Sequence, residues 1–253
     1  MSVTAVDPAP AGGVLSRWRN HPKFELWLAF WTMIVFYNFF FILFFAYTRV
    51  QPPPEPAWAI PRVLDWFASH RFNLLSGFAI VFLVTGLTGA ANALIAYSMR
   101  RMSVSPAFAH AYLVIYALSA VPGMLLTCIA ITVAAMRPER DPQVIAWLYD
   151  FAFMAFDGTM GVFLIGSLVW MVAILLDKNR VFPKWFAYLN LCNALTEVVV
   201  APAWMFTEGV FAWDGAITWW IDVAVFMIYT TVFITLLRNM IIREDFGDGP
   251  LPD

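Results

Sequence analysis

The sequence predicts an all-α membrane protein, a six-transmembrane-helix bundle with both termini cytoplasmic and a short outer interfacial amphipathic helix. The first observation behind this prediction is composition. Hydrophobic residues make up 62% of the 253 residues and charged residues only 13%, against roughly 45–50% and about 25% in soluble globular domains. A chain this apolar cannot cover itself with polar surface in water, so we expect its solvent to be a lipid bilayer. A net charge of -2 and 2 Cys exclude a nucleic-acid-binding module and a disulfide scaffold.

The second observation is a series of apolar stretches, each long enough to cross a membrane. A helix rises about 1.5 Å per residue, so about 20 apolar residues cross the roughly 30 Å hydrocarbon core. We expect one transmembrane domain at 24–240, between a flexible cytoplasmic N-terminal tail at 1–23 and a cytoplasmic C-terminal tail at 241–253. The six predicted spans are about 25–47, 73–97, 107–136, 145–176, 183–206 and 216–237.

The segment between the first two spans has a character of its own. Residues 51–56 read Gln-Pro-Pro-Pro-Glu-Pro, which cannot be helical. Residues 61–72 then mix apolar side chains such as Trp66 and Phe67 with polar ones such as Arg62, a pattern typical of an amphipathic helix lying at the outer interface. Such a helix would serve as an interfacial anchor or as a lid over a pocket.

Proline and glycine mark expected irregularities and close contacts within the spans. Pro122 in the third span and Pro202 in the fifth predict kinks. Gly86 and Gly89 in the second span each precede an alanine by four residues, a spacing that lets helix backbones approach closely. Gly166 in the fourth span is expected to do the same.

The distribution of Lys and Arg predicts the orientation. Basic residues near span ends are more numerous on the cytoplasmic side, and an even number of spans brings both termini to that side. We therefore expect a multi-pass protein of the cell inner (plasma) membrane with cytoplasmic N- and C-termini. One side receives Arg17, Arg19, Lys23, Arg100, Arg101, Lys178, Arg180, Lys184, Arg238 and Arg243, and the other receives Arg49, Arg62, Arg71, Arg137 and Arg140.

Carboxylates inside the spans are the candidates for chemistry. Asp157, Glu197 and Asp222 lie in three successive spans, each in the half of the membrane that we expect to face outward. A charged group at a helix centre costs roughly 2.5–3.5 kcal/mol on insertion scales and usually faces a cavity or a partner. Hydrocarbon favours the protonated acid, which can donate a proton or carry one. The alternative is that these acids only join helices through hydrogen bonds.

The helical period places further polar residues near these acids. Asn190, Asn193 and Glu197 stand at i, i+3 and i+7 in the fifth span and so share one face. Polar residues of the first and third spans reach comparable depth. We therefore expect a polar pocket with aromatic and apolar walls that opens outward. Its predicted ligand-binding residues are Tyr37, Asn38, Thr127, Asn190, Asn193 and Glu197.

Other chemistry is disfavoured, and we expect neither a metal nor a cofactor. The chain has 3 His with no clustered pair, which disfavours di-iron and haem sites. Phosphate-binding and serine-hydrolase motifs are also missing from the sequence. Cys128 and Cys192 lie within spans without a CxxC partner, which indicates packing residues.

Three motifs in the C-terminal 100 residues carry a resemblance. They are VFPKWFAYLN at 181–190, EGVFAWDG at 208–215 and FDG at 156–158. This part of the chain resembles uncharacterised bacterial, often actinobacterial, multi-pass membrane proteins. In those proteins a Phe-Pro-x-Trp-x-x-Tyr-Leu-Asn stretch opens one helix, and a Gly-x-Phe-Ala-Trp-(Asp/Asn)-Gly loop precedes the last. The resemblance implies no activity.

Three classes of function stay open at this stage. The first is binding or transport of a hydrophobic or amphipathic small molecule in an outer-half pocket with buried carboxylates. The second is a membrane-embedded acid–base enzyme of the isomerase or cyclase type, acting on a lipid, isoprenoid or sterol-like substrate. Asp157, Glu197 and Asp222 would then be the catalytic residues. The third is an accessory or structural subunit of a larger membrane complex, with partner subunits and no ligand.

Overall fold

The computed structural model describes residues 21–119, 121–157 and 161–247, and within these ranges every regular element is a helix. The all-α prediction is therefore confirmed for the described chain. The elements are α2 (Phe24–Phe41), η1 (Ile42–Tyr47), α3 (Ile60–Val84), η2 (Thr85–Leu87), α4 (Thr88–Arg101), α5 (Ala107–Ser119), η3 (Val121–Leu125), α6 (Leu126–Met136), α7 (Pro142–Asp157), α8 (Gly161–Leu176), α9 (Trp185–Val200), η4 (Ala201–Trp204), η5 (Ala216–Ile221) and α10 (Asp222–Arg243).

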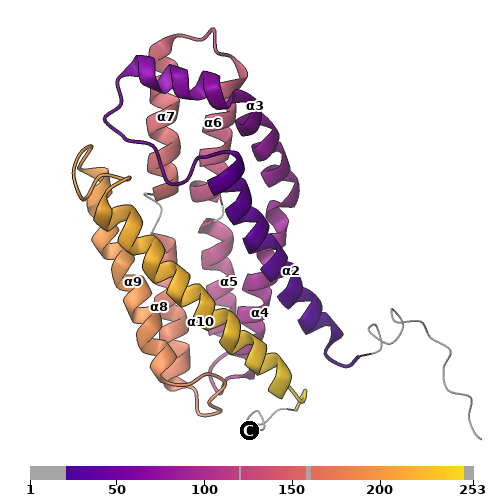
Figure 1. Ribbon diagram of the computed structural model, residues 1–253. Coiled ribbons are helices and arrows are strands. Elements are labelled where there is room, and N and C mark those ends of the chain that lie inside the picture. Colours follow the sequence, from indigo (N-terminus) through magenta and orange to yellow (C-terminus); the bar gives the residue numbers. More distant parts are fainter. Residues whose placement is uncertain (1–20, 120, 158–160, 248–253) are drawn as a thin grey trace, which may run out of the picture.

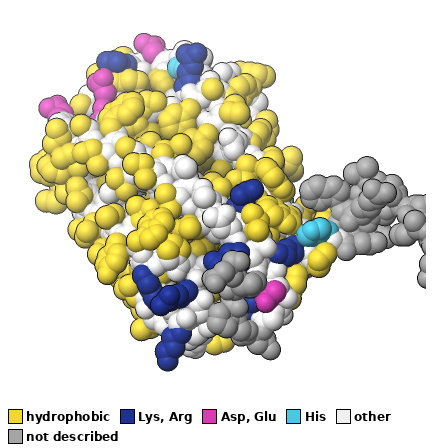
Figure 2. Space-filling model, turned by 60° about the horizontal axis from the view of Figure 1, so that its bottom comes forward, with side chains coloured by type: hydrophobic (Ala, Val, Ile, Leu, Met, Phe, Trp, Pro, Cys, Tyr) yellow, Lys and Arg dark blue, Asp and Glu magenta, His cyan; other side chains and the backbone are white. Residues whose placement is uncertain are grey.

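The helices run up and down between two chemically different ends (Figure 1). We call the end where α2 begins and α10 ends the basic end, because the described Lys and Arg of the predicted cytoplasmic group flank the helices there. Figure 2 shows several of these side chains gathered at that end, beside flanks that are largely hydrophobic. We call the opposite end the aromatic end. It carries Trp58, Trp147 and Trp213 in or beside the connections between helices.

Among the described residues, five helical stretches are long and apolar enough to cross a membrane. They are Phe24–Tyr47, Ile60–Arg101, Ala107–Met136, Trp185–Trp204 and Ala216–Arg243. Many large apolar side chains on them are exposed, including Leu83, Leu118 and Ile228. Lipid tails are the solvent in which such a surface is stable, so the structure supports a membrane protein.

The predicted fourth span is described as two helices. They are α7 (Pro142–Asp157) and α8 (Gly161–Leu176), and the residues between them lie outside the described part of the chain. Within α8, Phe163–Leu176 is apolar but too short by itself to cross the hydrocarbon core. The count of six spans therefore remains a prediction.

The expected boundary between an interfacial helix at 61–72 and a second span from 73 is wrong. Residues 61–72 are helical, but α3 runs without a break from Ile60 to Val84. Pro61 suits the first turn of a helix, and neither glycine nor proline occurs between 62 and 76 to interrupt it. The combined stretch Ile60–Arg101 has 42 residues, about twice the length that crosses a bilayer. Figure 1 shows the first turns of α3 lying across the aromatic end before the helix descends.

The helices depart from regular α geometry at the two prolines where kinks were predicted. Pro122 lies in the π-helix η3, and Pro202 lies in the 3-10 segment η4. Two further π-helices, η1 and η5, were not expected and have no proline. Segments of this type occur often at functional sites, and η5 leads directly into Asp222.

Two groups of buried side chains form the core. One packs α2, α4, α5, α8, α9 and α10 around Trp170, which touches Phe186, Tyr229 and Phe233 edge to face. The other packs η1, α3, α6 and α7 around Tyr149 near the aromatic end. Edge-to-face ring pairs add directional stabilisation to this packing.

The glycines divide into close-packed and open positions. A Cβ on Gly166 would lie 2.4 Å from Cε2 of Tyr116, so α8 and α5 touch there as expected. For Gly86 and Gly89, in contrast, a Cβ would meet nothing within 4 Å. The expectation that these two glycines form a packing face is therefore wrong within this chain.

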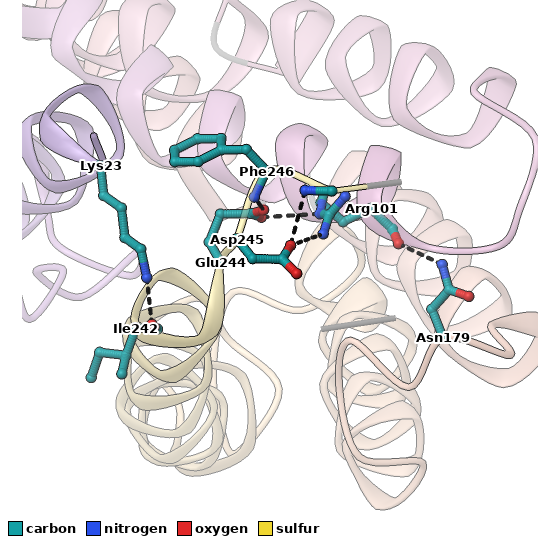
Figure 3. A network of polar contacts seen from close by, with 8 residues as sticks. Lys23, Arg101, Asn179, Ile242, Glu244, Asp245 and Phe246 are labelled. Atoms are coloured by element: carbon teal, nitrogen blue, oxygen red, sulfur yellow. Dashed lines mark hydrogen bonds and ion pairs between the residues drawn. The ribbon is translucent and has the colours of Figure 1, made fainter. Parts of the chain in front are cut away.

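A network of ion pairs and hydrogen bonds lies at the basic end (Figure 3). Nε of Arg101 lies 3.1 Å from Oε2 of Glu244, and its Nη2 lies 3.0 Å from Oδ1 of Asp245. Nδ2 of Asn179 donates a hydrogen bond to the Arg101 carbonyl at 2.9 Å. The network thereby joins α4, the connection between α8 and α9, and the chain that follows α10.

Candidate functional site

The polar face predicted on α9 is buried in the bundle. Asn190 is fully buried, Asn193 is 5% exposed and Glu197 is 8% exposed. Their spacing of three and four residues turns all three side chains toward α8 and α10, which flank α9. The prediction of a shared inward face is thus confirmed.

The two asparagines join α9 to its neighbours. Nδ2 of Asn193 donates to Oγ of Ser167 on α8 at 3.2 Å, and Oδ1 of Asn190 accepts from the Tyr229 hydroxyl on α10 at 3.0 Å. Nδ2 of Asn190 donates to the carbonyl of Phe186, one turn earlier on its own helix. These bonds satisfy buried polar groups and hold the three helices in a fixed register.

Tyrosines from three other helices surround this face. The rings of Tyr112 and Tyr116 on α5 have centroids 4.4 Å apart. Tyr116 lies near enough to Tyr37 on α2 and to Glu197 to interact with them electrostatically, and Tyr229 is close to Tyr37 and Tyr116. We call Tyr37, Tyr112, Tyr116 and Tyr229 the tyrosine cluster.

Glu197 differs from the asparagines because its carboxyl is not fully bonded. Its Oε2 atom is buried and has no hydrogen-bond partner among the described residues. The nearest charged neighbour that acts on it in the described chain is Asp222, the first residue of α10, which is half-buried. The side chain of Asp222 reaches Thr196 on α9. Two carboxyl groups from adjacent helices therefore lie close enough to interact electrostatically.

We call Glu197 and Asp222 the carboxyl pair. Glu197 comes three residues before the end of α9, and Asp222 begins α10 on the same side of the bundle. The pair therefore lies toward the aromatic end. Its half-buried member gives the pair contact with the surroundings of the bundle, while the other member is enclosed.

The structure places two further predicted residues, Asn38 and Thr127, away from this site, and a third, Asp157, is not described. Asn38 is exposed and donates to the carbonyl of Ile34 in its own helix. Thr127 is buried, but its hydroxyl lies 2.7 Å from the Ala152 carbonyl, so it joins α6 to α7. Asp157 is the last residue of α7, and its side chain lies outside the described part of the structure.

Sequence reasoning missed several residues of the site, namely Tyr112, Tyr116, Ser167 and Tyr229. Two signals for them existed. Tyr112 and Tyr116 are four residues apart, and Tyr229 follows Asp222 by seven, so each pair shares a helix face. These signals do not say which other helix the face meets, because that depends on the packing of the whole bundle.

The arrangement offers proton chemistry and polar contacts. The described residues contain no group of three or more His, Cys, Asp or Glu that could hold a metal ion. A carboxyl pair with neighbouring phenol and amide groups can bind a cationic or hydrogen-bonding group, or it can exchange a proton.

Comparison of the chain with protein-family models, with curated proteins and with solved structures finds no match.

Proposed function

We propose that this protein binds or transports a hydrophobic or amphipathic small molecule at the carboxyl pair of Glu197 and Asp222. The observation that supports this most is the Oε2 atom of Glu197, which is buried without a hydrogen-bond partner among the described residues. Leaving such an atom unbonded in an apolar medium costs a few kcal/mol. A ligand that offers a hydrogen-bond donor or a positive charge to this atom removes the cost. The site therefore has affinity for a ligand with a polar head group.

The surroundings of the pair fit a ligand with an apolar body. Tyr116 lies close enough to Glu197 to interact with it, and Phe163 lies beside Tyr116, so aromatic rings are near the carboxyl pair. Binding sites for small molecules are mostly apolar with a few placed polar groups. A molecule that reaches the site from the bilayer would bury its apolar part against these rings.

We further propose a six-span topology in the plasma membrane, with the basic end in the cytoplasm. The excess of Lys and Arg at the basic end supports this orientation. The carboxyl pair, lying toward the aromatic end, would then be in the outer half of the bilayer. We also propose kinship with the bacterial membrane proteins that share the Phe-Pro-x-Trp-x-x-Tyr-Leu-Asn stretch. In this chain the Trp and Tyr of that stretch are Trp185 and Tyr188, which are exposed at the basic end. Aromatic residues are common at such membrane interfaces.

One observation favours a second candidate function, a membrane-embedded acid–base enzyme acting on a lipid or isoprenoid. Glu197 and Asp222 lie on adjacent helices close enough to interact, and they differ in exposure. Such a difference can leave one acid as proton donor and the other as acceptor. A ligand that is recovered chemically altered would favour this enzyme over simple binding.

The test is mass spectrometry of gently purified protein, native and after organic extraction. Wild type is compared with Glu197→Gln and with Glu25→Gln, a matched change at an exposed residue in the first turn of α2. We expect one apolar species to be enriched over bulk lipid in wild type and Glu25→Gln and to be lost in Glu197→Gln. Bulk lipid alone in wild type, with a partner protein in fixed stoichiometry, would overturn the proposal in favour of an accessory subunit.

A further inference from the structure

The charges around the carboxyl pair narrow the class of ligand. The described groups that interact with Glu197 are neutral or acidic: Asp222 from α10 and Tyr116 from α5. No Lys or Arg among the described residues acts on Glu197. Two acids without a basic partner can both ionise only if a positive charge comes from elsewhere.

We propose that the site selects a lipophilic organic cation, which binds in exchange for a proton held by the carboxyl pair. This inference rests on the proposed function, because it names the chemical class of the ligand at the same site. The cation would lie between Glu197 and Asp222 and would place its apolar groups on the neighbouring rings. The displaced proton would pass from the pair to water through half-buried Asp222.

Tyr116 provides the second part of the recognition, because it lies close enough to Glu197 to interact with it. Tyr112 and Tyr116 lie with ring centroids 4.4 Å apart, and Phe163 meets Tyr116 edge to face at 5.7 Å. Aromatic faces carry negative potential and attract a desolvated cation. Phenol oxygens can also accept hydrogen bonds from a protonated amine.

Other charge classes fit the site poorly. An anionic head group would meet two acids, which repel negative charge. A neutral ligand would leave the pair without a counter-charge, so the pair would keep its proton. The site therefore distinguishes ligands by charge as well as by shape.

The cation is expected to compete with the proton. If one proton leaves for each cation bound, the affinity for the cation rises by up to about tenfold for each unit by which pH increases, as long as the carboxyl pair is protonated. The titratable groups of the described chain that interact with Glu197 are Asp222 and Tyr116. A carboxyl group is a stronger acid than a phenol, so the carboxyl pair is the group that releases the proton.

The test uses two probes of the same shape and opposite charge, tetraphenylphosphonium and tetraphenylborate. Binding of each labelled ion to the full-length protein in lipid nanodiscs is measured at several pH values, with empty nanodiscs subtracted. We expect saturable binding of tetraphenylphosphonium that tightens as pH rises, and no saturable binding of tetraphenylborate. We expect Glu197→Gln to weaken tetraphenylphosphonium binding by about thirtyfold or more, the lower end for truncating one member of a buried charge pair.

Two further variants make the result decisive. Glu25→Gln is the matched control at an exposed site and should bind as wild type does. Glu197→Asp keeps the charge and should retain binding to within about tenfold, roughly 1.4 kcal/mol, even if Glu197→Gln folds poorly. Equal binding of both probes, or unchanged binding in Glu197→Gln, would overturn the inference.

Failure of this inference can be told from failure of the proposed function. If tetraphenylphosphonium does not bind but mass spectrometry finds a Glu197-dependent neutral species, the ligand class is wrong and the binding function stands. If neither probe nor any extracted species depends on Glu197, both proposals fall.

Discussion

The hydroxyl of Tyr229 donates a hydrogen bond of 3.0 Å to Oδ1 of Asn190, and this bond joins α10 to α9 inside the bundle. Asn190 is fully buried, and the Tyr229 ring stacks on Phe186 with centroids 6.0 Å apart. The two helices that carry Asp222 and Glu197 are thus held together by a bond near the middle of their contact.

Tyr229→Phe should loosen that contact. The change keeps the ring but leaves the Asn190 oxygen without its donor, and hydrogen bonds between membrane helices average about 0.6 kcal/mol with a maximum near 1.7. We expect a loss of about 0.5–2 kcal/mol in unfolding free energy, measured by denaturation in mixed micelles. Tyr188→Phe, at an exposed position on α9, is the control and should change little. Equal losses in both variants would show that the Asn190 bond is not the cause.

Gly166→Ala should destabilise the bundle. Its new Cβ would lie 2.4 Å from a ring carbon of Tyr116 and 3.0 Å from the hydroxyl oxygen. Overpacking of this kind costs about 1–3 kcal/mol, more than the gain of up to about 1 kcal/mol in helix propensity. Because Tyr116 must move and lies near Glu197, ligand binding should weaken as well.

Gly89→Ala is the matched control for Gly166→Ala. A Cβ at Gly89 meets nothing within 4 Å, so only the gain in helix propensity applies. Thermal denaturation followed by circular dichroism should show opposite shifts for the two variants. A lower melting temperature for Gly89→Ala would instead indicate that this surface packs against something outside the chain.

Arg101→Gln should release the chain that follows α10. The Glu244 side chain is fully buried against Arg101, whereas the Asp245 side chain is 48% exposed. Breaking a fully buried ion pair costs about 3–5 kcal/mol of stability. Because solvent reaches this end of the bundle, we expect Arg101→Gln to lower the local stability by about 1–2 kcal/mol. Hydrogen exchange at residues 244–247 should speed up in Arg101→Gln and not in Arg100→Gln, whose side chain is exposed. Unchanged exchange would mean that the ionic network does not hold the segment.

Trp213→Phe should loosen the aromatic end. Nε1 of Trp213 donates to the Pro54 carbonyl at 2.6 Å, so the indole joins two connections far apart in the sequence. Its loss leaves that carbonyl without its donor at a cost of about 1–3 kcal/mol. Limited proteolysis should cut near residues 50–58 faster than in wild type. Trp220→Phe, at a residue 60% exposed, should leave the cutting rate unchanged.

Local periodicity predicted part of the site, and long-range packing determined the rest. The inward face of Asn190, Asn193 and Glu197 follows from helical spacing alone. Asn38 and Thr127 have similar depth along their helices, but depth does not determine direction, and their side chains bond elsewhere.

The fold shows the same division between local and long-range information. Composition and span length predicted the helical class, and Pro122 marked the position of η3. The sequence does not predict the continuity of α3, because its pattern changes from amphipathic to apolar near residue 73 while the helix continues. A helix can pass from interface to hydrocarbon without a break, since its backbone bonds are satisfied in both.

In the proposed site, Glu197 is an enclosed acid that a hydrophobic molecule can reach from the bilayer. Dicyclohexylcarbodiimide, an apolar reagent that modifies protonated carboxyl groups, tests it directly when the modified sites are mapped by peptide mass spectrometry. A water-soluble carbodiimide is the matched comparison, and Glu25 is the exposed reference carboxyl. We expect the apolar reagent to modify Glu197 and the water-soluble one to modify Glu25 while sparing Glu197. If the apolar reagent leaves Glu197 unmodified, or if the water-soluble reagent modifies it as readily as Glu25, the proposed site is contradicted.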